Sequence, residues 1–363
     1  MLGAMTIVEL IDIHGGFTII TDRIATRNPR ILLWPIGGLT FILSALLDNL
    51  ASALVMVSVT RNLVRQAEQR KLTAGMIIIA ANAGGAFSPI GDVTTTMLWI
   101  GGQVTTANII SELFLPSVIC LLVPLIVLCF SIRPEAKKQD GMEQEFTSRP
   151  YITPLARRDR RVVFSAGLTA IVMVPIFKSI THLPPYTAML LALRLVWVVS
   201  ELIHADKDEQ DRQRFSVAYA LSKIDVPSIL FFLGILLAVG DLESVGILEQ
   251  VATSLNESVD NLDIIVGIIG IASAIVDNVP IVAAAMGMYD LETYPTDHKL
   301  WEFLAYCAGT GGSLLVIGSA AGVAVMGMER LEFGWYLRRI SGSALLGYLG
   351  GGIVYLAAYA VSH

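Results

Sequence analysis

Three acidic residues lie inside long apolar stretches of the sequence: Asp48, Asp92 and Asp277. Two of them are followed by an amide side chain, since Asn49 comes after Asp48 and Asn278 after Asp277. Ionisable side chains at membrane depth are costly and usually functional. Burial disfavours a charged carboxylate and a bound cation favours it, so one carboxylate can hold a proton or a metal cation but not both. This competition is the simplest physical basis for exchanging one ion for the other.

Hydroxyl groups and helix-breaking residues accompany the acids. Around Asp92 the sequence reads Ser-Pro-Ile-Gly-Asp-Val-Thr-Thr-Thr, and Pro and Gly interrupt helical hydrogen bonding. Oxygen ligands with few carboxylates suit a hard cation. We therefore predict that the cation and the proton share one set of side chains, which also serve as the metal ligands: Asp48, Asn49, Asp92, Thr94, Thr95, Asp277, Asn278, Thr310 and Ser313. The competing interpretation is structural, because Asp and Asn cap helices and Ser and Thr bond to helix carbonyls.

The elements that position these residues must be membrane helices. Of the 363 residues, 54% are hydrophobic and 15% are charged, and the mean hydropathy is +0.67, whereas soluble domains carry about a quarter charged residues. Ten apolar runs have lengths suited to membrane spans: 2–20, 32–60, 73–100, 113–132, 162–181, 184–203, 224–241, 263–289, 301–328 and 340–361. We predict an all-α polytopic membrane protein whose partners are small cations and the lipid bilayer. The net charge of −6, with no basic face, argues against nucleic acid.

Four of the apolar runs contain an interruption. The runs 32–60 and 263–289 carry an Asp-Asn pair near the middle, and the runs 73–100 and 301–328 carry a glycine-rich stretch. Non-helical backbone at membrane depth persists only where protein or water satisfies it. We therefore expect two re-entrant hairpins, each with an Asp-Asn pair near its tip, and two broken transmembrane helices.

Lys and Arg are distributed unevenly among the loops. All but three of the 25 basic residues fall in five segments: 21–31, 61–71, 133–161, 204–223 and 329–339. Because cytoplasmic loops are enriched in Lys and Arg, these segments are predicted to face the cytoplasm. For this sidedness to hold, the hairpin at 32–60 must open to the cytoplasm and the hairpin at 263–289 to the outside.

The sequence also contains an internal repeat. Residues 42–49 and 271–278 are identical at five of eight positions, among them the Ser, the Asp and the Asn. Each copy then continues with a Gly-Gly pair, 36 residues after the Asp in the first copy and 34 in the second. Further on, Ile-Gly-Asp92 in the first copy corresponds to Ile-Gly-Ser319 in the second.

The loop charges give the two copies opposite orientations. We therefore predict two inverted repeats, residues 1–132 and 162–363, joined by a cytoplasmic linker at 133–161. Inverted repeats with interrupted helices are typical of secondary transporters, which bind their substrate near the midplane between the repeats. The second copy has spans upstream of its Asp-Asn motif that the first copy lacks, so we expect the first repeat to be truncated at its N-terminal end.

Four segments give the chain a resemblance to a known superfamily: Ser44–Asn49, Asn82–Asp92, Ser273–Asn278 and Gly309–Ser313. They resemble the motifs of the ion transporter superfamily, which includes arsenical pumps and dicarboxylate carriers. The Ser-Pro-Ile-Gly-Asp-Val-Thr-Thr form is most similar to the NhaD-type sodium/proton antiporters. The resemblance implies exchange of Na⁺ or Li⁺ for H⁺ by alternating access, a role in pH homeostasis, an inner (plasma) membrane location, no cofactor and a homodimer.

Other functions remain open at this point. Superfamily relatives carry anions, so the alternative is an anion, oxyanion or dicarboxylate carrier, which would aim hydroxyls, amides and helix N-termini at its substrate. Three site acids favour a cation. An enzyme is not expected, because an intramembrane aspartyl protease would need a Gly-x-Gly-Asp motif, which the sequence lacks, and would leave the repeat unexplained. A receptor that does not transport gives no reason for duplicated broken helices.

Overall fold

The computed structural model describes most of the chain, namely residues 2–16, 29–64, 66–131, 157–181, 185–205, 213–223 and 261–362, with isolated residues and stretches of up to four residues between them. All regular secondary structure in these ranges is helical, which confirms the predicted all-α class. The expected linker at 133–161 and the apolar run 224–241 lie mostly outside the described residues.

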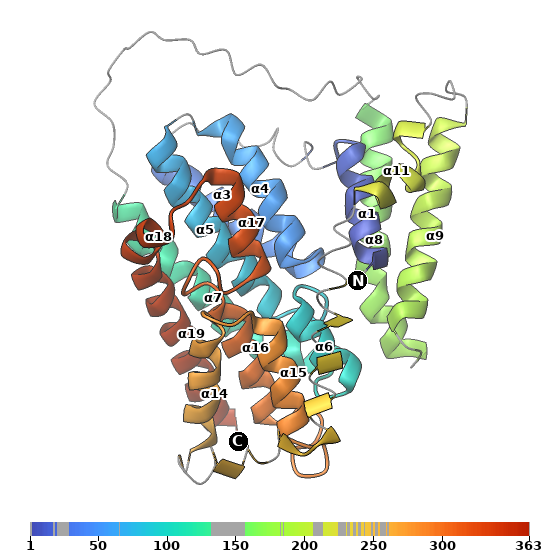
Figure 1. The fold of residues 1–363 in the computed structure, drawn as a ribbon. Coiled ribbons are helices and arrows are strands. Elements are labelled where there is room, and N and C mark those ends of the chain that lie inside the picture. The colour runs from blue at the N-terminus through green and yellow to red at the C-terminus, as the bar shows by residue number, and fades with distance from the viewer. Residues whose placement is uncertain are drawn as a thin grey trace.

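The helices form two groups (Figure 1). The larger group contains the helices around the predicted motifs: α3 (Pro29–Leu46), α4 (Asn49–Leu63), α5 (Ala67–Ala86), α6 (Val93–Gly101), α7 (Thr106–Ser131), α14 (Leu262–Ala272), α15 (Asn278–Met288), α16 (Lys299–Gly311), α17 (Ala320–Glu329), α18 (Phe333–Arg339) and α19 (Ser341–Ser362). The smaller group contains α1 (Leu2–Ile13), α8 (Arg157–Thr181), α9 (Pro185–His204) and α11 (Val217–Ser222). The smaller group stands beside the larger one, and α8 packs against α3.

Each of the four interrupted runs is divided into two helices, as the sequence predicts. The Asp-Asn runs become α3 with α4 and α14 with α15. The glycine-rich runs become α5 with α6, separated by residues 87–92, and α16 with α17, separated by residues 312–319. Because a helix that ends at membrane depth leaves unpaired N–H and C=O groups, the four breaks bring polar backbone into the interior of the larger group.

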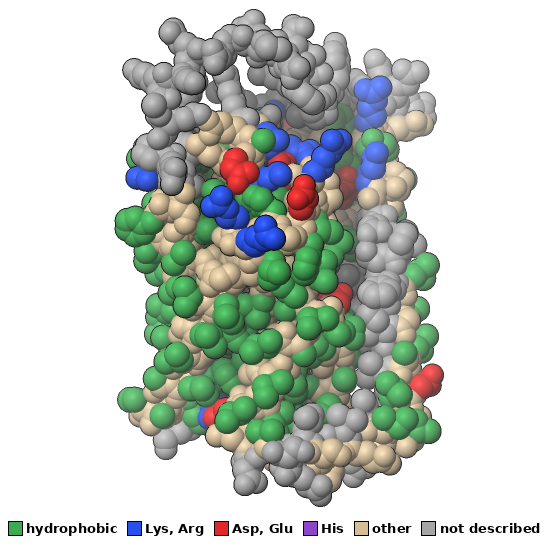
Figure 2. Space-filling model, turned by 60° about the vertical axis from the view of Figure 1, so that its left-hand side comes forward, with side chains coloured by type: hydrophobic (Ala, Val, Ile, Leu, Met, Phe, Trp, Pro, Cys, Tyr) green, Lys and Arg blue, Asp and Glu red, His purple; other side chains and the backbone are tan. Residues whose placement is uncertain are grey.

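The surface of the molecule fits a membrane environment. Among the described residues, three helices are long and apolar enough to cross a bilayer by length and composition, and they correspond to α7, α9 and α19. Large apolar side chains are exposed along α7 and α19, including Phe114 at 50% and Ile353 at 66%. In Figure 2, hydrophobic side chains cover most of one face, and charged side chains gather toward one end of it. Apolar surface of this extent is typical of contact with lipid or with another protein.

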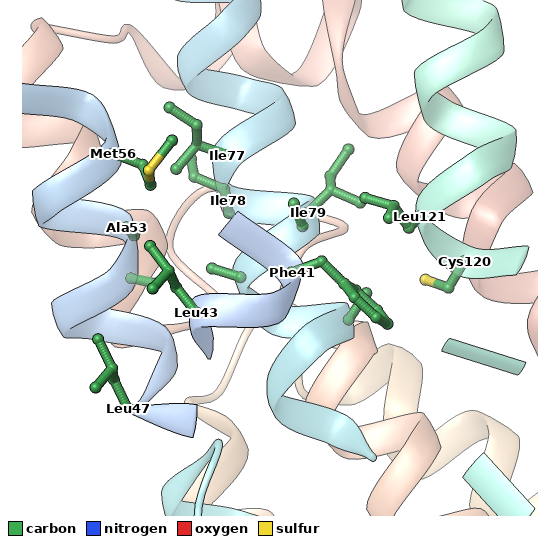
Figure 3. Packing of buried hydrophobic residues seen from close by; sticks show 14 of the residues in the cluster. Phe41, Leu43, Leu47, Ala53, Met56, Ile77, Ile78, Ile79, Cys120 and Leu121 are labelled. Atoms are coloured by element: carbon green, nitrogen blue, oxygen red, sulfur yellow. The ribbon is translucent and has the colours of Figure 1, made fainter. Parts of the chain in front are cut away.

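The core of the larger group surrounds α5. This helix is buried on all sides from Leu72 to Ala86, as expected for a helix that is apolar around its whole circumference. Figure 3 shows side chains of α3, α4 and α7 packed around it, and the residues labelled there include Phe41, Met56, Ile78 and Leu121. In the second copy, α16 is likewise buried from Leu300 to Gly311. The two glycine-rich helices therefore form the centre of the larger group.

Candidate functional site

The buried carboxylate of Asp92 is the centre of a polar cluster. Asp92 is only 2% exposed. Its Oδ1 accepts a hydrogen bond from Asn49 Nδ2 at 3.1 Å. Its Oδ2 accepts hydrogen bonds from Thr94 Oγ1 at 2.8 Å and from Asn278 Nδ2 at 2.9 Å. The structure thus joins four of the predicted site residues, and it connects the Asn of both Asp-Asn motifs to a single carboxylate.

Three helices begin at this cluster. Asn49 is the first residue of α4, Asn278 is the first residue of α15, and Asp92 is the N-cap of α6. The N-terminal end of a helix carries a partial positive charge because its first N–H groups have no partner within the helix. The three helix ends therefore oppose the cost of burying a negative charge at Asp92.

Asn82 links the cluster to the second copy of the repeat. Its Oδ1 accepts a hydrogen bond from Asn49 Nδ2 at 3.2 Å, and its Nδ2 donates to Ser313 Oγ and Ser319 Oγ, both at 2.9 Å. All of these side chains are buried. Asn82 was not among the predicted ligands, and neither was Ser319. The available signals were an amide within a long apolar run and, for Ser319, its position in the repeat, which matches that of Asp92.

The two other acids have different surroundings. Asp48 is the N-cap of α4, and its Oδ1 accepts a hydrogen bond from the Ala51 amide at 2.6 Å. Asp277 is the N-cap of α15, but its side chain makes no capping hydrogen bond. Its buried Oδ1 has no hydrogen-bond partner within the described part of the chain, and the next residue, Asn278, donates to Asp92. Asp277 therefore offers an open acceptor, whereas Asp48 acts as a helix cap.

Of the remaining predicted hydroxyl groups, two bond to the backbone and one belongs to the polar cluster. Thr95 donates to the backbone carbonyl of Asp92 at 3.0 Å, and Thr310 donates to the carbonyl of Tyr306 at 2.6 Å, one turn earlier in the same helix. Ser313 belongs to the cluster, because it accepts a hydrogen bond from Asn82. Hydroxyl groups often donate to helix carbonyls in this way. The hydroxyl protons of Thr95 and Thr310 are therefore used to satisfy backbone carbonyl groups near the helix breaks.

Matching close contacts support the breaks in the two copies. Ser44 Oγ donates to the Ala81 carbonyl at 2.5 Å, and Ser273 Oγ donates to the Ala308 carbonyl at 3.2 Å. A Cβ on Gly84 would collide with the backbone of Phe41, and a Cβ on Gly311 would collide with the backbone of Gly270. In each copy, only glycine allows the backbone of the broken helix to approach the neighbouring helix so closely. The equivalent positions of the repeat therefore make equivalent contacts.

The chemistry of this cluster suits a small cation as substrate. It offers the carboxylate oxygens of Asp92, an unpaired carboxylate oxygen on Asp277, and the hydroxyl and amide oxygens around them. Hard cations prefer oxygen ligands of this kind. The Asp92 carboxylate can also take up a proton, so one site can hold either ion.

Comparison with known proteins identifies a family and several relatives of the chain. The model of the citrate transporter family matches residues 1–309. Among individual relatives, sodium/proton antiporters 1 and 2 of Arabidopsis thaliana are 52% and 50% identical, each over 99% of this chain. The Na⁺/H⁺ antiporter NhaD of Vibrio parahaemolyticus is 33% identical over 84% of this chain.

The share of each relative that is covered differs. The chain spans 61% of the Arabidopsis antiporter 1, 84% of antiporter 2 and 75% of the Vibrio protein. The family match and the similarity to antiporters confirm the expectation of a transporter rather than an enzyme. The chain therefore belongs to the citrate transporter family, and its relatives include sodium/proton antiporters of the NhaD type.

Proposed function

We propose that the protein exchanges Na⁺, or Li⁺, for H⁺ across a membrane at the Asp92 cluster. The observation that carries the proposal is the buried Asp92 carboxylate, held by Asn49, Asn278 and Thr94. The names of the relatives from Arabidopsis and Vibrio support sodium and proton as the exchanged ions.

Exchange follows from competition for the same oxygens. When the ionised Asp92 binds the cation, the negative charge is neutralised and no proton is held. When the cation leaves, the buried charge favours uptake of a proton, because an unpaired charge in this environment is costly. The three donor side chains keep the carboxylate oriented in both states, and Asp277 supplies a second negative group beside the site.

We infer that access to the site alternates between the two sides of the membrane. The equivalent contacts in the two copies support a repeat, and the uneven distribution of Lys and Arg supports opposite orientations of its halves. In this arrangement α3 with α4 and α14 with α15 form re-entrant hairpins that open to opposite sides. The division at residues 1–132, 133–161 and 162–363 belongs to the same proposal. An inner-membrane location and a homodimer remain predictions from the resemblance.

A second candidate is an anion carrier, which one observation favours. The N-termini of α4, α6 and α15 meet at the cluster, and such ends bind anions. The family also takes its description from citrate. The Asp92 carboxylate already lies at these three ends, however, and its charge would repel a carboxylate substrate.

Proton flux in everted membrane vesicles tests both candidates. The vesicles come from bacterial cells that lack their own sodium/proton antiporters and express this chain. We expect added Na⁺ or Li⁺ to release protons from vesicles acidified by respiration, with no response to K⁺. Citrate uptake without a response to Na⁺, in correctly inserted protein, would overturn the antiporter proposal in favour of the anion carrier.

A further inference from the structure

A buried carboxylate outside the Asp92 cluster, that of Glu329, lies at the C-terminal end of α17. The side chain of Glu329 is 2% exposed. Its Oε1 accepts from Arg61 Nε at 2.6 Å, and its Oε2 accepts from Arg70 Nε at 2.6 Å. Arg61 also donates to the backbone carbonyl of Met328. Both oxygens of one carboxylate are therefore paired with a guanidinium group, which makes Glu329, Arg61 and Arg70 an ion-pair cluster.

The ion-pair cluster joins α4, α5 and α17, which are also linked beside the Asp92 carboxylate through Asn49, Asn82 and Ser319. Arg61 lies in the last turn of α4, which begins at Asn49. Arg70 lies in the first turn of α5, which carries Asn82 near its other end. Glu329 is the last residue of α17, whose N-cap is Ser319. Each helix therefore has one polar contact in each cluster, separated by about 15–18 Å along its axis.

Packing in the structure agrees with this arrangement. The helix α17 packs against both α4 and α5, and the three lie side by side in Figure 1. At the cation site these helices are joined by hydrogen bonds from Asn49 to Asn82 and from Asn82 to Ser319. A tilt or shift of α17 at its Glu329 end would therefore displace Ser319 from Asn82 at the other end.

The helix α6 is the counterpart of α17 in the first copy of the repeat, because Asp92 and Ser319 are equivalent N-caps. The C-terminal end of α6 is also anchored, but without an ion pair among the described residues. Asp297 accepts hydrogen bonds from the Thr105 amide at 2.6 Å and the Thr105 hydroxyl at 2.8 Å. Thr296 donates to the carbonyl of Gly102, the C-cap of α6, at 2.7 Å. The far ends of α6 and α17 are thus both held, and within the described part of the chain only that of α17 is held by ion pairs.

We propose that Glu329 is a positioning residue for the cation site. Its ion pairs hold α17 against α4 and α5, which keeps Ser319 on Asn82 and Asn82 beside Asn49. The inference rests on the proposed cation exchange at Asp92. Glu329 is buried, whereas the side chains of Arg61 and Arg70 are 45% and 30% exposed, so both arginines can turn to solvent when the Glu329 charge is removed. Loss of that charge therefore removes both ion pairs and releases the end of α17.

The test is the sodium dependence of proton flux in vesicles that contain the purified full chain. We expect Glu329→Gln to raise the apparent KM for Na⁺ by about 2- to 30-fold, the range for coupling through an intervening element, while the maximal rate per inserted protein is retained. Glu329→Asp keeps the charge and should restore part of the affinity. Glu332→Gln, an exposed acid three residues later, is the matched control and should behave as the wild type.

A double-mutant cycle separates positioning from general destabilisation. Ser319→Ala removes the hydroxyl through which α17 contacts Asn82, so Glu329→Gln should raise KM less in that background than in the wild type. An unchanged KM for Glu329→Gln, or additive effects of the two substitutions, would overturn the positioning role alone. A wild-type chain without any sodium response would overturn the proposed exchange and the positioning role together.

Discussion

Replacing Asp92 by Asn removes the charge of the central carboxylate while keeping its shape. An Asn carbonyl in place of Oδ2 can still accept from Thr94 and Asn278, which are 2.8 Å and 2.9 Å away in the wild type. The new amide then faces Asn49 Nδ2, which was 3.1 Å from Oδ1. One donor is left facing another donor, which costs about 1–3 kcal/mol of folding free energy. The variant should therefore fold and insert.

The effect on cation binding should be much larger than the effect on folding. Two unit charges about 4 Å apart attract by about 4 kcal/mol at an effective dielectric constant of about 20. Loss of this attraction corresponds to about a thousandfold loss of affinity for Na⁺. The variant should also release no proton when Na⁺ is added, because no titratable group remains at position 92.

Isothermal titration calorimetry of the purified protein with NaCl at alkaline pH measures the affinity for Na⁺. A pH-sensitive dye follows the release of protons. Glu302→Gln is the matched control, because Glu302 is another buried acid, bonded to Tyr355 at 2.6 Å in the first turn of α16 and outside the cluster. It should bind Na⁺ as the wild type does. Retention of wild-type affinity by Asp92→Asn, in folded protein, would refute the assignment of Asp92.

Three further predictions concern the same site. The Asp→Asn substitutions should reduce Na⁺ affinity in the order Asp92, Asp277, Asp48, because Asp277 has an open oxygen and Asp48 is used as a cap; equal losses at Asp48 and Asp92, measured by the same titration, would contradict this ranking. Asn278→Ala should lower the affinity for Na⁺, because it removes a hydrogen-bond donor to Asp92. Thr95→Ser keeps the hydroxyl that donates to the Asp92 backbone carbonyl, so its proton flux in vesicles should equal that of the wild type. Gly84→Ala should destabilise the fold by about 1–3 kcal/mol, because the added methyl group would collide with the backbone of Phe41. Gly38→Ala, with open space around the glycine, should not destabilise the fold. Equal thermal unfolding temperatures of the two variants would contradict the close approach of α5 to α3 at Gly84.

The sequence was sufficient to predict the helix breaks. Asp-Asn pairs and glycine-rich stretches inside apolar runs mark places where helical hydrogen bonding ends, and α3/α4, α5/α6, α14/α15 and α16/α17 are divided there. The repeat also indicated that Ser319 takes the place of Asp92 in the second copy. These features depend on local chemistry and on spacing, which a single sequence contains.

The roles of individual acids could not be predicted in the same way. Asp48, Asp92 and Asp277 all precede helices, and Asp is a good N-cap residue. Only tertiary packing decides that Asp48 bonds to its own helix while Asp92 receives donors from α4 and α15. Asn82 was missed for a related reason: its equivalent in the second copy is Gly309, so the repeat gave no signal for it.

The long-range ion pairs of Glu329 also depend on tertiary packing and could not be predicted from the sequence. Arg61 and Arg70 were counted only as basic residues that indicate sidedness, but both bind Glu329, more than 250 residues away along the chain. Charge counting predicts on which side of the membrane a loop lies. It contains no information about which carboxylate a guanidinium group contacts.

The most direct test of the account is the pH dependence of sodium transport by the wild-type chain in lipid vesicles. If one carboxylate holds either ion, protons and Na⁺ compete, so the apparent KM for Na⁺ should rise as the pH falls while the maximal rate stays constant. The same competition should be absent from Asp92→Asn. An apparent KM for Na⁺ that does not change with pH, or sodium uptake without movement of protons, would contradict the account.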